Sequence, residues 1–228
     1  VWRRGERVWD TNSFFQGSFV KEVNDQFKTQ VNAKYAFYRT HYVNNDDKLI
    51  EVDNLYKQRE VYVSTANMYT IFPFWDVSMS YDFQWNEMKA DMYGFVFPTR
   101  FTNLLSIATA LRLGKVKLQG SGLATFVNDR VKEGPAPKAR QILTPAVFLS
   151  YKPFDKHDFS LRAFYKKTFR MPTFNDLYYA DMGNSKLDPE YVTQYNLGTV
   201  YQKQWGNKLF RHFKIQADGY YNYVKDKI

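Results

Sequence analysis

Few side chains in this 228-residue sequence have a spacing that supports catalysis or metal binding. The three histidines, His41, His157 and His212, are scattered along the chain, and none shares a metal-ligand spacing such as His-x-x-x-His. Cysteine is absent, which excludes disulfides and thiolate metal sites. The sequence therefore predicts a protein that is not an enzyme, with no metal site and no cofactor.

An oxygen-rich segment and a glycine pair offer two weaker kinds of site. The segment consists of Asn44, Asn45, Asp46, Asp47, Glu51 and Asp53. Its oxygens suit a calcium ion, but the EF-hand ligand spacing is absent, so a solvated loop is the favoured interpretation. Gly120 and Gly122 flank a single serine, which is too short for a phosphate-binding loop; in a strand such glycines more often mark a bend.

The segment 169–189 combines an arginine, acids and paired tyrosines in one long loop. As candidate ligand-binding residues we single out Arg170, Asn175, Asp176, Tyr178, Tyr179 and Asn184. A second interpretation stays open, because Arg170 can pair with Asp176 while Phe174 and Leu177 pack inward. In this second interpretation, which we call the loop-order interpretation, the same residue types stabilise the loop instead of binding a ligand.

The elements that must position this loop are strands. From Trp75 to Asn86 every second residue is large and apolar, and the residues between them are polar. This alternation predicts a strand with one apolar and one polar face. The run is about twice the usual strand length, and about 9–11 residues suffice to cross a bilayer in a tilted barrel strand. Similar alternation recurs along the chain and predicts about ten strands.

The connections between these strands alternate between short and long. Short turns are predicted near residues 24–25, 72–73, 114, 153–155 and 206–207, and long loops at 43–58, 87–100, 127–140 and 169–189. This alternation is typical of a barrel whose two rims face different compartments. We predict an all-β fold: an antiparallel up-and-down meander of long strands within a transmembrane β-barrel, with residues 1–228 forming a single domain.

Composition agrees with this fold class. Aromatic residues make up 19% of the chain, as expected for strands with interfacial belts, and no apolar run approaches the roughly 20 residues of a helical span. The formal charge of +9 suits an anionic partner. The basic residues do not form a compact block with interleaved aromatics, so we expect no nucleic-acid partner.

Residues 164–201 read FYKKTFRMPTFNDLYYADMGNSKLDPEYVTQYNLGTVY. This segment resembles the TonB-dependent receptors of Gram-negative outer membranes. That family commonly has an Arg-x-Pro-(Ser/Thr)-Phe-x-(Asp/Glu)-Leu-Tyr loop, then a Gly-Asn-x-x-Leu-x-Pro-Glu segment and a Tyr-Glu-x-Gly strand. The matching residues are Arg170, Pro172, Thr173, Phe174, Asp176, Leu177, Tyr178, Gly183, Asn184, Leu187, Pro189, Glu190, Tyr195, Leu197 and Gly198. Asn196 departs from the pattern, because the family usually has Glu there. Residues 1–95 fit by alternation only.

The resemblance implies an outer-membrane receptor that takes up a scarce nutrient with TonB-coupled energy. The nutrient would be a ferric siderophore, haem, cobalamin or an oligosaccharide, and the partners would be outer-membrane lipid, TonB and the ligand or metal chelate. The family barrel has roughly 22 strands and a plugged lumen. We therefore expect about half a barrel, without the plug, the TonB-recruiting box or the final strand. Such a piece should not close, and its open edges should favour self-association.

Basic side chains on the polar strand faces form a second candidate site. If these faces line a lumen, they would attract anionic cargo, or they would pair with acids on a plug. The residues are Lys28, Lys34, Lys117, Arg162 and Lys166, with Lys203 and Lys214 on the same predicted face. Two other function classes remain open: a passive porin-like barrel and a soluble all-β binding or adhesion domain.

Overall fold

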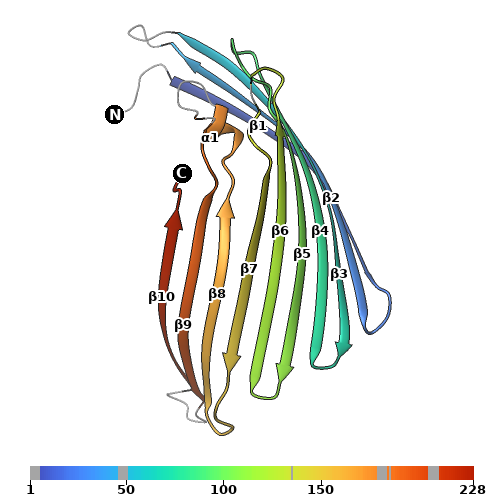
Figure 1. Ribbon diagram of the computed structural model, residues 1–228, viewed down its shortest axis with the longest axis vertical. Helices are drawn as coiled ribbons and strands as arrows, with labels where there is room; N and C mark the ends of the chain where they lie inside the picture. Colours follow the sequence, from blue (N-terminus) through green and yellow to red (C-terminus); the bar gives the residue numbers. More distant parts are fainter. Residues whose placement is uncertain (1–5, 46–50, 135, 179–183, 185, 205–210) are drawn as a thin grey trace.

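Long antiparallel strands form one curved sheet in the computed structural model, which describes residues 6–45, 51–134, 136–178, 184, 186–204 and 211–228. The strands follow chain order from β1 to β10, each hydrogen-bonded to its sequence neighbour (Figure 1). Their bounds are β1 Glu6–Glu22, β2 Phe27–Asn44, β3 Val52–Phe72, β4 Trp75–Ala90, β5 Thr99–Leu113, β6 Val116–Arg130, β7 Arg140–Tyr151, β8 Asp158–Arg170, β9 Glu190–Gln204 and β10 His212–Lys225. The all-β meander of about ten strands is confirmed.

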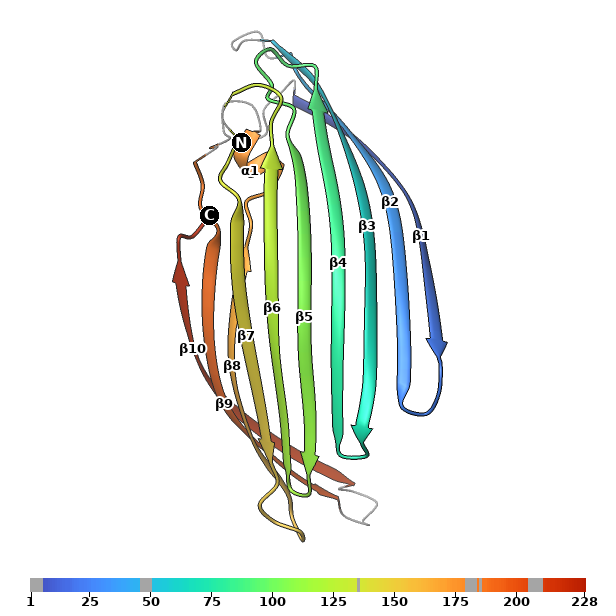
Figure 2. The same ribbon diagram turned by 45° about the vertical axis from the view of Figure 1, so that its right-hand side comes forward.

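The sheet curves like part of a barrel wall but stays open. β1 and β10 form its two edges, so the prediction that these strands do not close on themselves is confirmed (Figure 2). Whether the edges associate with another copy stays a prediction.

Short turns join the strands at one rim, as predicted. In the β1–β2 turn, Asn24 Oδ1 accepts hydrogen bonds from the backbone N–H groups of Gln26 and Phe27 at 2.9 and 2.7 Å. Gly114 begins the β5–β6 turn with a φ of 55°, a conformation that glycine adopts without strain. The predicted turn at 206–207 lies outside the described residues.

The loops at the other rim are shorter than predicted. The expected loop at 43–58 is wrong in extent, because β2 continues to Asn44 and β3 begins at Val52. Likewise β4 ends at Ala90, β6 at Arg130 and β7 begins at Arg140. Where both faces of a strand are polar, the alternation fades although the backbone pairing continues, so the sequence pattern underestimates the length of the strand. The loop after β8 also contains a helical turn that was not predicted, α1, Phe174–Tyr178.

The two faces of the sheet differ in chemistry. In β4 the side chains of Val77, Met79 and Phe83 share the convex face with Val63 and Ile107, as the strand register requires. Large hydrophobic side chains are exposed there, including Phe15 at 79% and Ile107 at 55%. The opposite, concave face carries the polar residues of the alternating pattern, which confirms the predicted two-sided strands.

The main buried apolar cluster lies at the loop rim, not within the sheet. Phe174 of α1 packs with Tyr56 of β3, Met88 and Ala90 of β4, and Phe95 of the β4–β5 loop. Because β8 and β3 lie far apart in the sheet, Phe174 joins parts of the wall that are distant along it. Figure 1 shows α1 at the upper end of the curved sheet. The loop after β8 therefore folds over the concave face; we call residues 171–178 the rim loop.

Candidate functional site

The rim loop is shaped by a local hydrogen-bonded turn. The Thr173 backbone N–H donates to Asp176 Oδ2 at 2.8 Å, and the Asp176 N–H donates to Thr173 Oγ1 at 3.1 Å. This reciprocal pair is a capping box at the start of α1. Leu177 N–H completes the turn by donating to the Thr173 carbonyl at 3.1 Å. The Thr-Phe-Asn-Asp sequence thus encodes its own helical turn.

Arg170 and Asp176, both candidate ligand residues, contact each other. Arg170 Nη2 lies 3.2 Å from Asp176 Oδ2. The hydrogen bond from the Thr173 backbone N–H holds the pKa of Asp176 below its usual range, and the Arg170 charge adds to this against the opposing effect of partial burial. The pairing expected under the loop-order interpretation is therefore present, and both charges are occupied in holding the turn.

A buried ion pair fastens the rim loop to the barrel wall. Arg100 is the second residue of β5 and Asp129 is the last but one of β6, and the strand register places them directly opposite each other. Arg100 Nε and Nη2 donate to the two oxygens of Asp129, both at 2.7 Å, in a bidentate pair. Arg100 Nη1 donates to the Pro172 carbonyl at 2.7 Å. We call Arg100, Asp129 and Pro172 the latch.

Aromatic packing completes the attachment. The Arg100 guanidinium lies 5.2 Å from the centroid of the Phe174 ring, a cation–π distance. Phe174 and Leu177 are buried, as expected under the loop-order interpretation. Burial raises the pKa of the Tyr178 hydroxyl, whose oxygen is buried, and the nearby Asp129 charge raises it further, against the opposing charge of Arg100.

Of the remaining candidate ligand residues, Asn184 is held by hydrogen bonds and Asn175 is exposed. The Asn184 N–H donates to the Asp176 carbonyl at 2.9 Å, and Asn184 Oδ1 accepts from the Lys186 N–H at 3.0 Å. Asn175 is exposed at the surface of α1. Tyr179 lies outside the described residues. The loop thus offers Asn175 and the part-exposed Tyr178 to a ligand, while Arg170 and Asp176 stabilise the turn.

Sequence reasoning missed the latch, although a signal for it exists. The two residues after β5, Gly114 and Lys115, form the turn to β6. Counting the same number of residues back from Gly114 and forward from Lys115 brings Arg100 opposite Asp129. Both lie on the face that also carries Thr102 and Val127. Opposite charges in one register row are the signal that was not used.

The candidate lumen cations lie on the concave face, as predicted. Three have acidic partners: Lys28 with Glu22 at 3.1 Å, Lys34 with Glu60 at 2.9 Å, and Arg162 with Asp218 at 3.4 Å. Within the described ranges, Lys117 and Lys166 have no ion pair. Lys203, by contrast, pairs in register with Phe213 and shares the convex face with Tyr201, so its predicted face is wrong.

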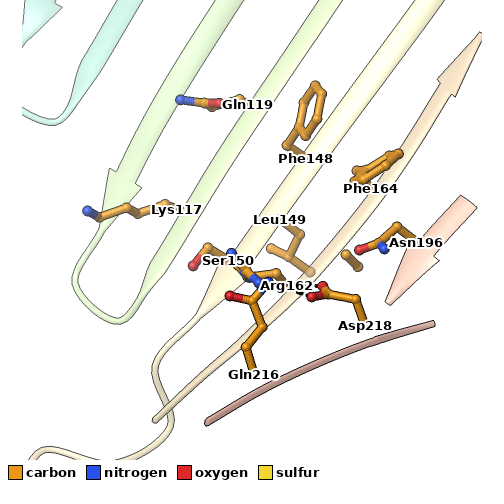
Figure 3. A pocket seen from close by; sticks show the side chains of 11 residues that line it. Lys117, Gln119, Phe148, Leu149, Ser150, Arg162, Phe164, Asn196, Gln216 and Asp218 are labelled. Carbon is orange, nitrogen blue, oxygen red and sulfur yellow. Dashed lines mark hydrogen bonds and ion pairs between the residues drawn. The ribbon is translucent and has the colours of Figure 1, made fainter. Parts of the chain in front are cut away.

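A cavity of about 430 Å³ opens on the concave face near the short-turn rim (Figure 3). Phe148 and Phe164 line it with ring centroids 5.5 Å apart, and Arg162 reaches toward Asp218. Gly198 lies between these two charged residues in the register, and a Cβ there would collide with the Asp218 carboxylate. The pair therefore bridges three strands because the middle one carries glycine.

A second cavity, of about 340 Å³, lies beneath the rim loop. Its lining combines Gln58, Glu60, Asn86 and Arg100 from the wall with Phe174 from the loop. In the parts of the chain that the structure describes, there is no cluster of three or more His, Cys, Asp or Glu side chains arranged to hold a metal ion. A search of the same residues finds no helix with the length and hydropathy needed to span a membrane.

Comparisons with known proteins agree with this architecture. The copper transporter OprC superposes with a TM-score of 0.76 at 15% identity, covering 98% of this chain and 40% of its own. The FrpB iron transporter of Neisseria meningitidis (F5-1 variant) has a TM-score of 0.72 at 13% identity, covering 95% and 36%. The ferric citrate transporter FecA has a TM-score of 0.60 at 12% identity, covering 96% and 39%. The chain thus spans about 40% of the length of the OprC structure.

No curated protein matches the sequence. A family model described as TonB dependent receptor-like, beta-barrel, matches residues 1–228, the whole chain. One explanation accounts for the open ten-stranded wall, its apolar convex face and the loop folded across its hollow. This chain belongs to the TonB-dependent receptor β-barrel family, whose members are transport receptors and not enzymes.

Proposed function

We propose that this chain forms part of the wall and rim of an outer-membrane receptor in a Gram-negative bacterium. The receptor imports a scarce nutrient, such as a ferric siderophore, haem, cobalamin or an oligosaccharide, with energy delivered by TonB. Family membership supports transport in general. The structural neighbours bear the names of copper, iron and ferric citrate transporters, which favours a metal or metal chelate among these nutrients.

The two-sided sheet is the observation that carries this proposal. Soluble monomers rarely expose a large continuous apolar patch. Here exposed hydrophobic residues recur on the convex face from β1 to β10, while ion pairs and amides line the concave face. A bilayer against the convex face and a hydrated lumen against the concave face would satisfy the side chains of both faces. This argues against the soluble binding-domain interpretation.

We assign ligand capture to the outer surface of the rim loop. Asn175 and Tyr178 of the rim loop would contact the ligand together with Tyr179 and Asn184, which follow it in the sequence, and Arg170 with Asp176 would hold the shape of the turn. The latch supports this assignment, because a binding surface needs side chains held on a rigid base. Lys117 and Lys166 would attract anionic cargo or acidic groups of a plug through the lumen.

Uptake in living cells tests the proposal. A strain lacking the full-length receptor should lose growth on one of five probes: ferric citrate, a ferric catecholate, haemin, cyanocobalamin or a maltodextrin. Growth should return with the wild-type gene only when TonB is present. Uptake that persists without TonB would favour the passive porin. Recovery of the receptor in the soluble fraction after alkaline extraction would overturn the membrane assignment.

A further inference from the structure

Three basic side chains lie side by side on the convex face near the loop rim. The register places Arg39 of β2 directly opposite Lys57 of β3, and Lys57 directly opposite Lys89 of β4. All three are exposed. We call these three residues the basic row. Like charges directly opposite each other destabilise a sheet, so the row raises the free energy of the folded wall unless an anion lies against it.

Among the described residues, the nearby acids pair with only one member of the row, Lys89. Glu87 lies 3.2 Å from Lys89 but also stands opposite Arg59 in the register. Asp53 of β3 is engaged with His41, whose Nε2 lies 2.6 Å from its Oδ1. On β1 the residue opposite Arg39 is the uncharged Thr11. Among the described residues, neither Arg39 nor Lys57 forms an ion pair.

The position of the basic row along the strands indicates which layer of a bilayer would lie against it. The apolar convex band ends at Trp85 of β4 and at Val61, its partner on β3. Lys89 lies four residues further along the strand, roughly 10 Å higher once barrel tilt is included. This distance corresponds to the headgroup layer above a hydrocarbon core. Long basic side chains also extend readily along a wall toward such a layer.

We propose that the basic row binds the phosphate groups of anionic lipid headgroups in the leaflet at the loop rim. The inference rests on the membrane placement proposed above. Continuity with the apolar band favours a lipid over a soluble anion, because the acyl chains and the phosphates of one molecule contact adjoining surfaces. The site lies on the outer wall, away from the rim loop and the lumen, and so has no part in ligand capture.

Direct binding provides the first test. The full-length receptor in non-ionic detergent is titrated with diphosphorylated lipid A, with the same lipid after phosphate removal, and with inorganic phosphate. A basic side chain near an anionic lipid surface contributes about fivefold in affinity, so the triple variant R39Q/K57Q/K89Q should lose on the order of a hundredfold for lipid A. The matched control K21Q/K156Q/K203Q removes equal charge near the short-turn rim and should bind as wild type.

Each other outcome overturns the proposal in a defined way. Equal loss in the control would mean that net charge alone attracts the lipid. Unchanged binding in the triple variant would place the site elsewhere. Equal affinity for inorganic phosphate would identify a site for a free anion, and equal affinity for the dephosphorylated lipid would show that phosphate is not recognised.

The sign of a stability change provides a second test. K57Q removes the middle charge, so it should raise the melting temperature in non-ionic detergent, where only repulsion acts. It should lower the melting temperature in bilayers that contain lipid A, where attraction is lost. The same direction in both environments would refute the inference. Failure of the wild-type receptor to insert into the bilayer would instead refute the proposed membrane function.

Discussion

The latch should control how firmly the rim loop is held, and Asp129→Asn is the sharpest way to test it. This substitution keeps the shape of the side chain but removes its charge. Arg100 would then remain buried at 11% exposure, with the Pro172 carbonyl and the Phe174 ring as its remaining partners. The guanidinium would lack a counter-charge in a place from which water is largely excluded.

The magnitude follows from the burial of the pair. Asp129 is 4% exposed and both of its oxygens accept from Arg100, so solvent screening is slight. Removing one partner of a buried ion pair costs about 3–5 kcal/mol. The Asn oxygen still accepts one hydrogen bond, so we expect a cost at the lower end of this range, about 3 kcal/mol. This cost corresponds to about a 150-fold larger open population of the rim loop.

Amide hydrogen exchange of α1 measures that population. The Leu177 N–H donates to the Thr173 carbonyl and is protected only while the turn is closed. In the Asp129→Asn receptor its protection should fall by about two orders of magnitude. Asp218→Asn is the matched control, because Arg162 and Asp218 are 42% and 31% exposed and such pairs contribute about 0–1 kcal/mol. It should leave Leu177 exchange unchanged.

Unaltered Leu177 exchange in the Asp129→Asn receptor would refute the latch. A loss of protection that extends equally through the strands would mean that the pair supports the whole wall and not the loop. Only a loss confined to the rim loop agrees with the geometry.

Three further predictions concern the turn of the rim loop, the glycine in β9 and the convex face. The lowered pKa of Asp176 means that its stabilisation of the turn is complete above its unfolded value of about 4 and is lost as pH falls through the folded pKa. Leu177 protection, corrected for intrinsic exchange, should therefore stay level from about pH 7 to 5 and fall below about pH 4. Gly198→Ala should displace Asp218, break its ion pair and destabilise the barrel by about 1 kcal/mol in denaturant titration. Ile107→Arg on the convex face should cost about 2–4 kcal/mol in bilayers, whereas Ser106→Arg on the concave face should be tolerated.

Each of these predictions has its own control. Asp176→Asn should remove the acid-dependent step, and a step that persists would assign it to another group. The cost of Gly198→Ala should disappear in an Asp218→Ala background, and additive costs would contradict the collision. Equal destabilisation by the two arginine variants would contradict the assignment of faces.

The strands and their faces could be predicted because alternation is a property of the backbone itself. Successive side chains point to opposite sides of any strand, so the pattern from Trp75 to Asn86 fixed both the element and its orientation. The same reasoning failed at 52–58, which it assigned to a loop although β3 begins at Val52. Polar residues such as Asp53 and Asn54 occupy both faces there, so side-chain polarity no longer reports on pairing. The pattern thus reveals the two-sided part of a strand better than its full length.

The candidate site was predictable only where it depends on neighbours in sequence. Arg170 and Asp176 lie six residues apart, and their pairing follows from local turn chemistry. Arg100 and Asp129 require the register of a hairpin, which can be counted from its turn. The third contact, to Pro172, depends on the curvature of the sheet, and no spacing in the sequence expresses that curvature.

The placement of the core has a physical consequence for the loop. A thin curved wall, with an apolar convex face and a polar concave face, has little interior in which to bury side chains. The rim loop supplies that interior by placing Phe174 over Tyr56, Met88 and Phe95. Residues that shape the mouth of the barrel are therefore also residues that stabilise it, so substitutions in the buried part of the loop should change ligand capture and stability together. Substitution of exposed Asn175 should separate the two effects, because its side chain belongs to the surface and not to the cluster.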